Sequence, residues 1–235
     1  MGGFKNTELN NIFNYSLFDE IAEKVLLCSE MMNSDYICFD KKIENLEEKI
    51  RTHLLENYLE NDEIRTKLGI DKLDIRFMAE VPENHDTSQD IYLGRVDIKV
   101  VGVNWLFSNS KDYYIIECKR IDGSSVLNEK FVKEGIARFT SEPIKYSSYN
   151  DKNFMFGFVV KAIDIEENTL KIDSLQNKNN NISIRQGLVQ VENKIINSYM
   201  YISKYNVKEK VLELKHLFYD FSEIIVQASD NISNQ

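Results

Sequence analysis

The spacing of hydrophobic residues predicts helices in four parts of the chain. Between residues 8 and 32, apolar residues recur at three- and four-residue intervals, which is typical of one or two amphipathic helices. The same spacing predicts a helix over 42–59 and another from about 127 to 139. A last amphipathic helix is expected over 208–227.

Strand-like patterns fill much of the remaining sequence. Strands are expected at residues 75–81, 91–103, 113–118, 154–160 and 199–205. Pro82 is expected to end the first of them, and the polar run 83–89 to form a loop. The segment 154–160 is almost wholly apolar, which is typical of a strand buried on both faces. The Asn-rich residues 177–181 predict a further loop.

This order of elements predicts an α/β sandwich, in which helices flank a mixed central β-sheet. Only 2 prolines and 9 glycines occur in 235 residues, so few linkers are expected. We therefore expect a single domain over 1–235. Within it, residues 1–40 would form an N-terminal helical extension, 43–160 the core and 208–227 a C-terminal helix.

The formal net charge of −9 limits the ways in which the chain could bind nucleic acid. Proteins that bind nucleic acid through bulk electrostatics usually carry an excess of positive charge. A local basic patch or a bound cation would have to offset the repulsion here. The charge also favours a homodimer or a complex with a partner subunit, which could supply basic surface.

Several classes of protein are excluded by what the sequence lacks. No apolar run approaches the roughly 18–20 residues that span a bilayer, so no membrane partner is expected. The N-terminus has no signal-peptide pattern, which favours a cytoplasmic location. The 3 cysteines form no CxxC pair, so neither a disulfide framework nor a structural zinc is expected. The HExxH, G-x-S-x-G, P-loop and G-x-G-x-x-G motifs are also absent.

The candidate chemistry lies in one of the Glu-x-Lys triplets. The chain contains four of them, so the triplet alone carries little information, but Glu117-Cys118-Lys119 directly follows the apolar run 113–116. Alternate side chains of a strand share a face, so Glu117 and Lys119 are expected to point the same way. Two charges beside a buried strand are costly unless they are paired or hold a metal.

Asp97 supplies a second acid, in the middle of the strand expected over 91–103. Val96, Ile98 and Val100 are expected to share one face, with Asp97 on the other. A connection over 102–112 would let the two strands lie antiparallel and bring Asp97 close to Glu117. Two carboxylates in this position suit Mg²⁺ or Mn²⁺, which would polarise a phosphate and acidify a bound water. Lys119 would orient or deprotonate that water, or neutralise charge on the phosphorane.

Asp97 followed by Glu117-x-Lys119 at the end of an apolar strand resembles the signature of the PD-(D/E)xK, or restriction-endonuclease-like, nuclease superfamily. The resemblance covers roughly residues 43–160, and Val96 stands where the signature has proline. It implies that Asp97 and Glu117 bind the metal together with the Cys118 carbonyl, and that Lys119 is catalytic. It further implies a metal-dependent endonuclease that acts on DNA, with a role in bacterial defence as an association of the family.

Two further features extend this resemblance. Many members carry a glutamate on the first core helix, for which Glu44, Glu47, Glu48 and Glu56 are candidates. Glu47 lies closest to the apolar stripe centred near Ile50, so we expect Glu47 to be the additional metal ligand. The segment 135–139 resembles a helix of bacterial members whose arginine faces the site, which makes Arg138 a candidate for substrate binding. Arg120 is a second candidate.

Other interpretations of the same residues remain open. Asp97, Glu117 and Lys119 could form a ladder of surface salt bridges, and Arg138 could pair with a structural acid. The protein could also be a catalytically idle binding or interaction subunit with the same fold, or an RNase. The three histidines show no metal-binding spacing and are expected to be structural or exposed.

Overall fold

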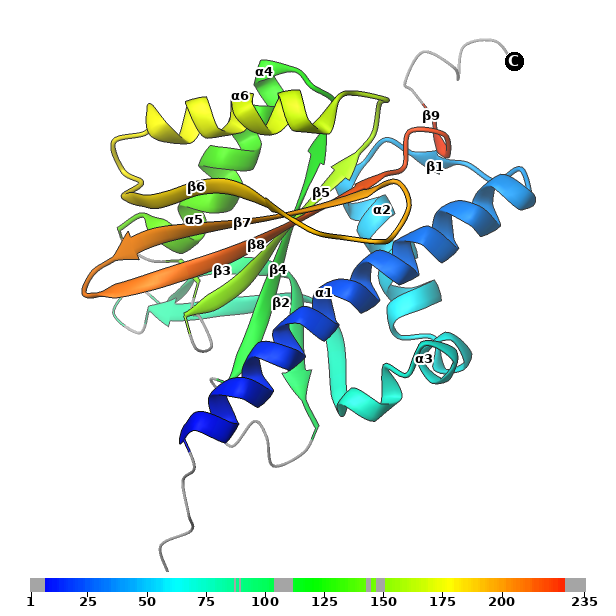
Figure 1. Cartoon of the computed structure of the whole chain (residues 1–235), viewed down its shortest axis with the longest axis horizontal. Helices are drawn as coiled ribbons and strands as arrows, with labels where there is room; N and C mark the ends of the chain where they lie inside the picture. Colours follow the sequence, from blue (N-terminus) through cyan, green and yellow to red (C-terminus); the bar gives the residue numbers. More distant parts are fainter. Residues whose placement is uncertain are drawn as a thin grey trace, which may run out of the picture.

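A seven-stranded mixed sheet forms the centre of the molecule (Figure 1). The computed structural model describes residues 7–86, 88, 90–103, 112–142, 145–146 and 151–226. The strands are β2 (Ile75–Asp86), β3 (Ile91–Gly102), β4 (Tyr113–Ile121), β5 (Lys152–Val159), β6 (Ile184–Val191), β7 (Ser198–Val207) and β8 (Lys210–Asp220). Their order in the sheet is β2-β3-β4-β5-β8-β7-β6. Strands β4, β5 and β8 are parallel, and the other neighbours are antiparallel. The predicted α/β class with a mixed sheet is thus confirmed.

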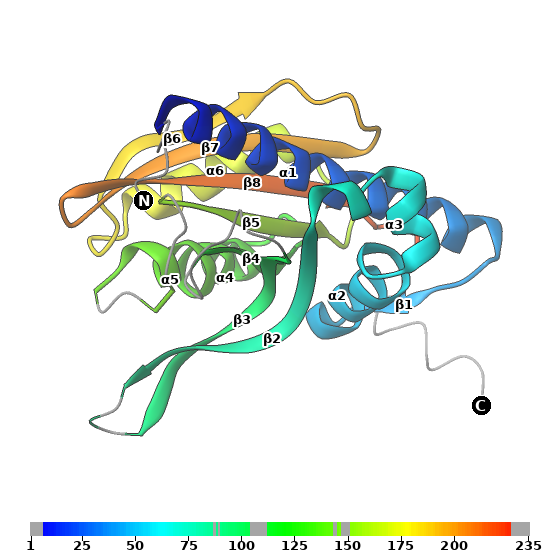
Figure 2. The ribbon, with the colours of Figure 1, turned by 90° about the horizontal axis from the view of Figure 1, so that it is seen from below.

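Helices cover both faces of this sheet (Figures 1 and 2). On one face lie α1 (Thr7–Cys38), α2 (Glu47–Leu54), the π-helical turn η1 (Leu55–Leu59), α3 (Asp62–Leu68) and the 3-10 turn η2 (Asp71–Leu73). On the other face lie α4 (Ser125–Lys130), the π-helical turn η3 (Phe131–Ile136), α5 (Ala137–Thr140) and α6 (Ile165–Asn177). A small parallel sheet pairs β1 (Ile43–Glu44) with β9 (Ile225–Val226). Within the described part of the chain, no helix is both long and apolar enough to cross a membrane.

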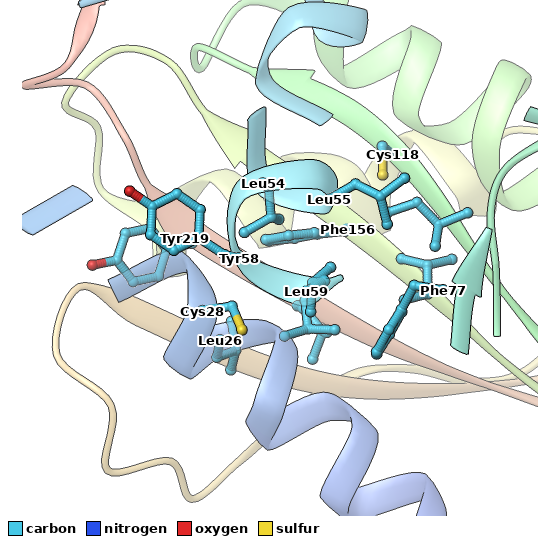
Figure 3. Close-up of a cluster of buried hydrophobic side chains, with 14 of the residues drawn as sticks. Leu26, Cys28, Leu54, Leu55, Tyr58, Leu59, Phe77, Cys118, Phe156 and Tyr219 are labelled. Carbon is cyan, nitrogen blue, oxygen red and sulfur yellow. The ribbon is translucent and has the colours of Figure 1, made fainter. Parts of the chain in front are cut away.

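The two cores follow from the alternation of side chains along β4. Tyr114, Ile116 and Cys118 pack into the cluster under α1 and α2, which Figure 3 shows in part. Ile115 and Ile121 pack into the cluster under the second helical layer. Residues 113–119 and 121 are all buried, so β4 is covered on both faces. Charged side chains on such a strand must find partners inside the protein.

The prediction of a C-terminal helix over 208–227 is wrong, because residues 210–220 form strand β8. This strand lies between β5 and β7, and residues 214–219 are all buried. A strand covered on both faces loses its polar alternation, and a short apolar run cannot then be told from a helix by periodicity. Two polar side chains inside β8 make tertiary contacts, since Lys215 pairs with Asp19 of α1 and His216 Nε2 lies 2.6 Å from Ser203 Oγ.

The sequence pattern missed both α6 and β6. The N-cap of α6 is Asp164, whose carboxylate accepts a hydrogen bond of 2.9 Å from the Glu167 backbone N–H. Asp followed three residues later by Glu is a helix-start signal, so this element had a local signature. Strand β6 lies at the edge of the sheet and is nowhere fully buried, which explains its weak hydrophobic pattern.

Two predicted boundaries also change. Strand β2 does not end at Pro82 but continues to Asp86, opposite β3, so part of the expected loop 83–89 is strand. Pro82 is tolerated because β2 is an edge strand, which leaves one side of its backbone without a neighbour. The helix expected over 42–59 begins only at Glu47, since residues 43–44 pair with β9. Figure 2 shows the far half of the β2–β3 hairpin extending away from the helices.

Close packing between β5 and β8 allows a stability test of this architecture. A Cβ atom at Gly157 would lie 2.3 Å from Cδ1 of Phe218, whose ring is stacked on Phe131 at 5.5 Å between centroids. Since that ring cannot move easily, Gly157→Ala should lower the free energy of unfolding by about 1–3 kcal/mol in urea titrations. Gly69→Ala, where the nearest atom is 4.0 Å away, tests the cost of a positive φ without such overlap. An unchanged stability of Gly157→Ala would contradict the packing of β8 against β5.

Candidate active site

The register of β3 and β4 brings Asp97 beside Glu117. The two strands are antiparallel, and Ile98 pairs with Ile116. At the next position along β3, the side chain of Asp97 provides the hydrogen-bond acceptor for the β4 backbone. Its Oδ2 atom accepts a hydrogen bond of 2.8 Å from the Cys118 backbone N–H. The carboxylate of Asp97 is therefore fixed at the point where β3 and β4 separate.

An irregularity of the neighbouring strand lies at the same level. Glu80 of β2 has a φ of 50°, between the pairs Ala79–Ile98 and Val81–Val96. A left-handed conformation is uncommon for a residue other than glycine, and it stores local strain. Val96 and Ile98 pack on opposite faces of the sheet here: Ile98 lies in the core under α1, and Val96 lies in the core under α4–α6. The prediction that Val96 shares a face with Ile98 and Val100 is therefore wrong.

The ammonium group of Lys119 is surrounded by oxygen atoms. Its Nζ lies 2.8 Å from Glu117 Oε1, 3.0 Å from Glu47 Oε1 and 3.8 Å from Asp97 Oδ2. It also donates a hydrogen bond of 2.7 Å to the Cys118 carbonyl. Burial alone would lower the pKa of Lys119, but the carboxylates of Glu117, Asp97 and Glu47 outweigh it and raise that pKa. Lys119 is thus held as a cation.

Two arginines bind the carboxylates from opposite sides. Arg51 of α2 donates through Nη1 to Asp97 Oδ1 at 2.6 Å and pairs through Nη2 with Glu80. Arg138 of α5 donates through Nη1 to Glu117 Oε1 at 2.7 Å. The two acids of the strand pair are therefore neutralised by three cations, which come from one strand and from both helical layers.

Tyr146 completes the environment of Glu117. Its hydroxyl group donates to Glu117 Oε2 at 2.8 Å and accepts from Arg138 at 2.5 Å. The Tyr146 ring packs over Gly94, where an added Cβ would lie 2.8 Å from the ring. Packing is also close at Gly135, since a Cβ there would lie 2.4 Å from Met155 Cε and 3.6 Å from Lys119 Cγ.

The site reaches the surface at its two outer residues. The side chain of Glu117 is 0% exposed and that of Lys119 7%, whereas the exposed fractions are 12% for Asp97 and 31% for both Glu47 and Arg138. Glu47 and Arg138 are therefore the most accessible of these groups. Glu117 lies between Lys119, Arg138 and Tyr146.

The structure separates the predicted candidates into two groups. Among the four glutamates considered on the first helix, Glu47 contacts Lys119 and also accepts from the Arg120 backbone N–H at 3.3 Å. The other three, Glu44, Glu48 and Glu56, are exposed. The Arg120 side chain turns away from the carboxylates and binds the Asn45 carbonyl and its Oδ1. Arg120 thus ties β4 to the start of α2, and its predicted contact with substrate finds no support in this geometry.

Arg51 and Tyr146 were missed by sequence reasoning. Arg51 carried a usable signal, because it follows Glu47 by four residues and therefore lies on the same face of the helix. Tyr146 had no such signal, since only the folded chain brings it to β4.

The structure describes the side chains of His53 and His216, and both are structural, as expected. His53 lies 2.5 Å from the Tyr36 hydroxyl group, and His216 is buried beside Ser203.

The oxygen donors around Lys119 are of the kind that Mg²⁺ and Mn²⁺ prefer. They come from the same four residues as the predicted metal-ligand set, namely Glu47, Asp97, Glu117 and Cys118. Within the described ranges, however, no group of three or more His, Cys, Asp or Glu side chains is arranged to hold a metal ion. The Lys119 ammonium lies between these carboxylates. The donor types suit a hard cation.

Burial raises the pKa of Glu117 to about 7, and the nearby Asp97 adds to this effect. Lys119 and Arg138 offset only part of the shift. In the unfolded chain Glu117 would ionise near its ordinary value of 4.5. Between these two pH values the unfolded state binds fewer protons, so stability falls as the pH rises through this window.

Glu117→Gln should remove this pH dependence. We expect the free energy of unfolding of the wild type to fall, relative to this variant, by about 1–3 kcal/mol from pH 4.5 to pH 7. Urea titrations at several pH values would measure the difference. Glu48→Gln, on the exposed side of α2, should follow the wild type. Parallel curves for wild type and Glu117→Gln would show that the Glu117 carboxyl does not titrate in this range.

In comparisons with known proteins, no family model matches the chain, and neither a curated protein nor a solved structure shows significant similarity to it.

Proposed function

We propose that this protein is a metal-dependent nuclease with a restriction-endonuclease-like fold, which hydrolyses phosphodiester bonds in DNA with Mg²⁺ or Mn²⁺. The observation that carries the proposal is the set of oxygen atoms around the Lys119 ammonium. Three carboxylates and one carbonyl from α2, β3 and β4 converge on a single cation. The mixed sheet with helices on both faces agrees with the expected sandwich.

Glu47, Asp97, Glu117 and the Cys118 carbonyl would hold the metal. When bound, the metal supplies a polarised phosphate oxygen and an acidified water. The Cys118 N–H group fixes the orientation of Asp97, while Arg138 and Tyr146 fix that of Glu117. The raised pKa of Lys119 favours a role for its ammonium in balancing negative charge on the phosphate rather than in removing a proton from water.

A second candidate, an idle binding subunit, is favoured by a different observation. All three carboxylates are already engaged by cations, and Glu117 is completely covered. A protein that binds through this fold without catalysis would need no metal. Titration calorimetry separates the two candidates, because only the nuclease should bind Mn²⁺ and lose that binding in Glu117→Ala.

The direct test is cleavage by the purified chain. Circular DNA, linear DNA and labelled RNA would be incubated with Mg²⁺, with Mn²⁺ and with a chelator. We expect cleavage of circular DNA that requires the metal, as befits an endonuclease. Cleavage of RNA alone would indicate an RNase. An absence of cleavage with every substrate, together with an absence of metal binding, would overturn the proposal.

A further inference from the structure

A cavity of about 700 Å³ is lined in part by Arg138, which also binds Glu117. Its walls come from the helix formed by η3 and α5 and from the turn that follows α6. Apolar side chains of Val132 and Leu175 form part of the wall. The remainder is polar, including the turn 179–181 with its three asparagines.

The charge of this cavity is opposite to that of the whole chain. Among its described lining residues, Lys133, Arg138, Lys145 and Lys178 are cationic, and Glu129 and Glu142 are anionic. Lys133 is paired with Glu129 at 2.6 Å, and Arg138 with Glu117 at 2.7 Å. This described lining carries four formal positive charges against two negative ones, on a protein whose formal net charge is −9. Such a local excess attracts anions even where the overall charge repels them.

The cavity and the candidate active site share one wall. Arg138 lines the cavity and also donates to Glu117 at 2.7 Å. The Lys145 backbone N–H donates to the Arg138 carbonyl at 3.2 Å. The next residue, Tyr146, binds the second oxygen of Glu117. Arg138 therefore contacts both the cavity and the buried carboxylate.

We propose that this cavity binds a phosphate group of the nucleic-acid strand that flanks the phosphate being cleaved. The inference rests on the proposed function and adds a binding site to it. Lysines act as point charges toward phosphate, and the asparagine amides supply hydrogen-bond donors. A volume of about 700 Å³ is within the usual range for small-molecule sites and accommodates a nucleotide. The cavity provides the local basic surface that an acidic nuclease needs.

The test is the salt dependence of DNA binding by the double variant Lys145→Ala/Lys178→Ala. Fluorescence anisotropy with a labelled oligonucleotide, in Ca²⁺ instead of Mg²⁺, would give Kd at several salt concentrations. We expect Kd to rise about tenfold, and the slope of log K against log salt to fall by roughly 0.7–1.8 for one or two lost phosphate contacts. Lys67→Ala/Lys72→Ala, which removes two lysines near α3 on the other side of the sheet, should leave both quantities unchanged.

The possible results separate this inference from the proposed function. If the wild type cleaves DNA and the cavity variant keeps the wild-type Kd and slope, the cavity is not a phosphate site and the nuclease assignment stands. A wild type that binds no DNA overturns both. An equal loss of affinity in the two double variants would indicate bulk electrostatics, and would also overturn the cavity site.

Discussion

Lys119→Ala should reduce the rate of DNA cleavage by about 10²–10³-fold, as expected for the loss of one charged group that stabilises a transition state. The reason is the position of its ammonium group, 2.8 Å from Glu117 and 3.0 Å from Glu47, at the centre of the carboxylate cluster. Glu117→Ala should be at least as severe, because it removes a proposed metal ligand. Single-turnover cleavage of a labelled duplex in Mg²⁺, with protein in excess, would measure both effects.

The chain offers a matched control for this experiment. Lys194 belongs to another Glu-x-Lys triplet, which lies beyond the end of β6 and outside the carboxylate cluster. Lys194→Ala should cleave at the wild-type rate. Because Lys119→Ala leaves Glu117 buried without its closest cation, the fold of each variant should be verified by near-ultraviolet circular dichroism. Lys119→Met/Glu117→Gln removes both charges together and tests the site even if the single variant unfolds. Folded variants that retain full cleavage would refute the assignment of these residues.

Arg51→Ala should lower the free energy of unfolding by about 3 kcal/mol in the absence of metal. Arg51 is buried and neutralises two carboxylates, those of Asp97 and Glu80. Without it, Asp97 would lie beside Glu117 with Lys119 Nζ, 3.8 Å away, as its remaining cationic neighbour among the described side chains. Thermal and urea unfolding with and without Mg²⁺ would measure the loss and any recovery.

Added Mg²⁺ should restore part of this stability, and should stabilise Arg51→Ala more than it stabilises the wild type. In the wild type a metal competes with Arg51 for Asp97, and this competition disappears in the variant. Arg65→Ala is the matched control. Arg65 is also a buried arginine, but it binds Glu60 and the carbonyls of Leu59 and Ile75. Its loss should destabilise the fold with no gain in the response to Mg²⁺. Equal stabilisation of the wild type and both variants by Mg²⁺ would show that Arg51 does not compete with a metal for Asp97.

These two experiments address different functions of the same cluster. The Lys119 and Glu117 variants test chemistry on the substrate, whereas the Arg51 variant tests how the carboxylates are held in the absence of metal. Glu47, Asp97 and Glu117 are all paired with cations in the structure, so binding of a metal would require exchange of partners. In the described part of the chain, these donors are not arranged as a metal cluster.

The sequence by itself determined the local part of the site. Strand alternation requires Glu117 and Lys119 to share a face of β4, and the spacing along α2 places Glu47 on its inner side. The structure brings these three together with Asp97, and it brings Arg138 to Glu117. The shared face of Glu117 and Lys119 and the inner position of Glu47 are predictable because each depends on the geometry of one element, whereas Arg138 was expected only from the family resemblance.

Only the tertiary structure decided the rest, since those features depend on neighbours that are distant in the chain. Strand β8 has a helix-like pattern, and it is a strand because β5 and β7 pair with it on both sides. Val96 packs in the core under α4–α6, although local alternation predicts that it shares a face with Ile98 and Val100. Tyr146 reaches Glu117 across 29 residues and Arg51 reaches Asp97 across 46. Burial on both faces erases periodicity, and a contact between distant residues leaves no local signal of its partner. The position of Arg51 on the helix face of Glu47 could be predicted, but its pairing with Asp97 could not.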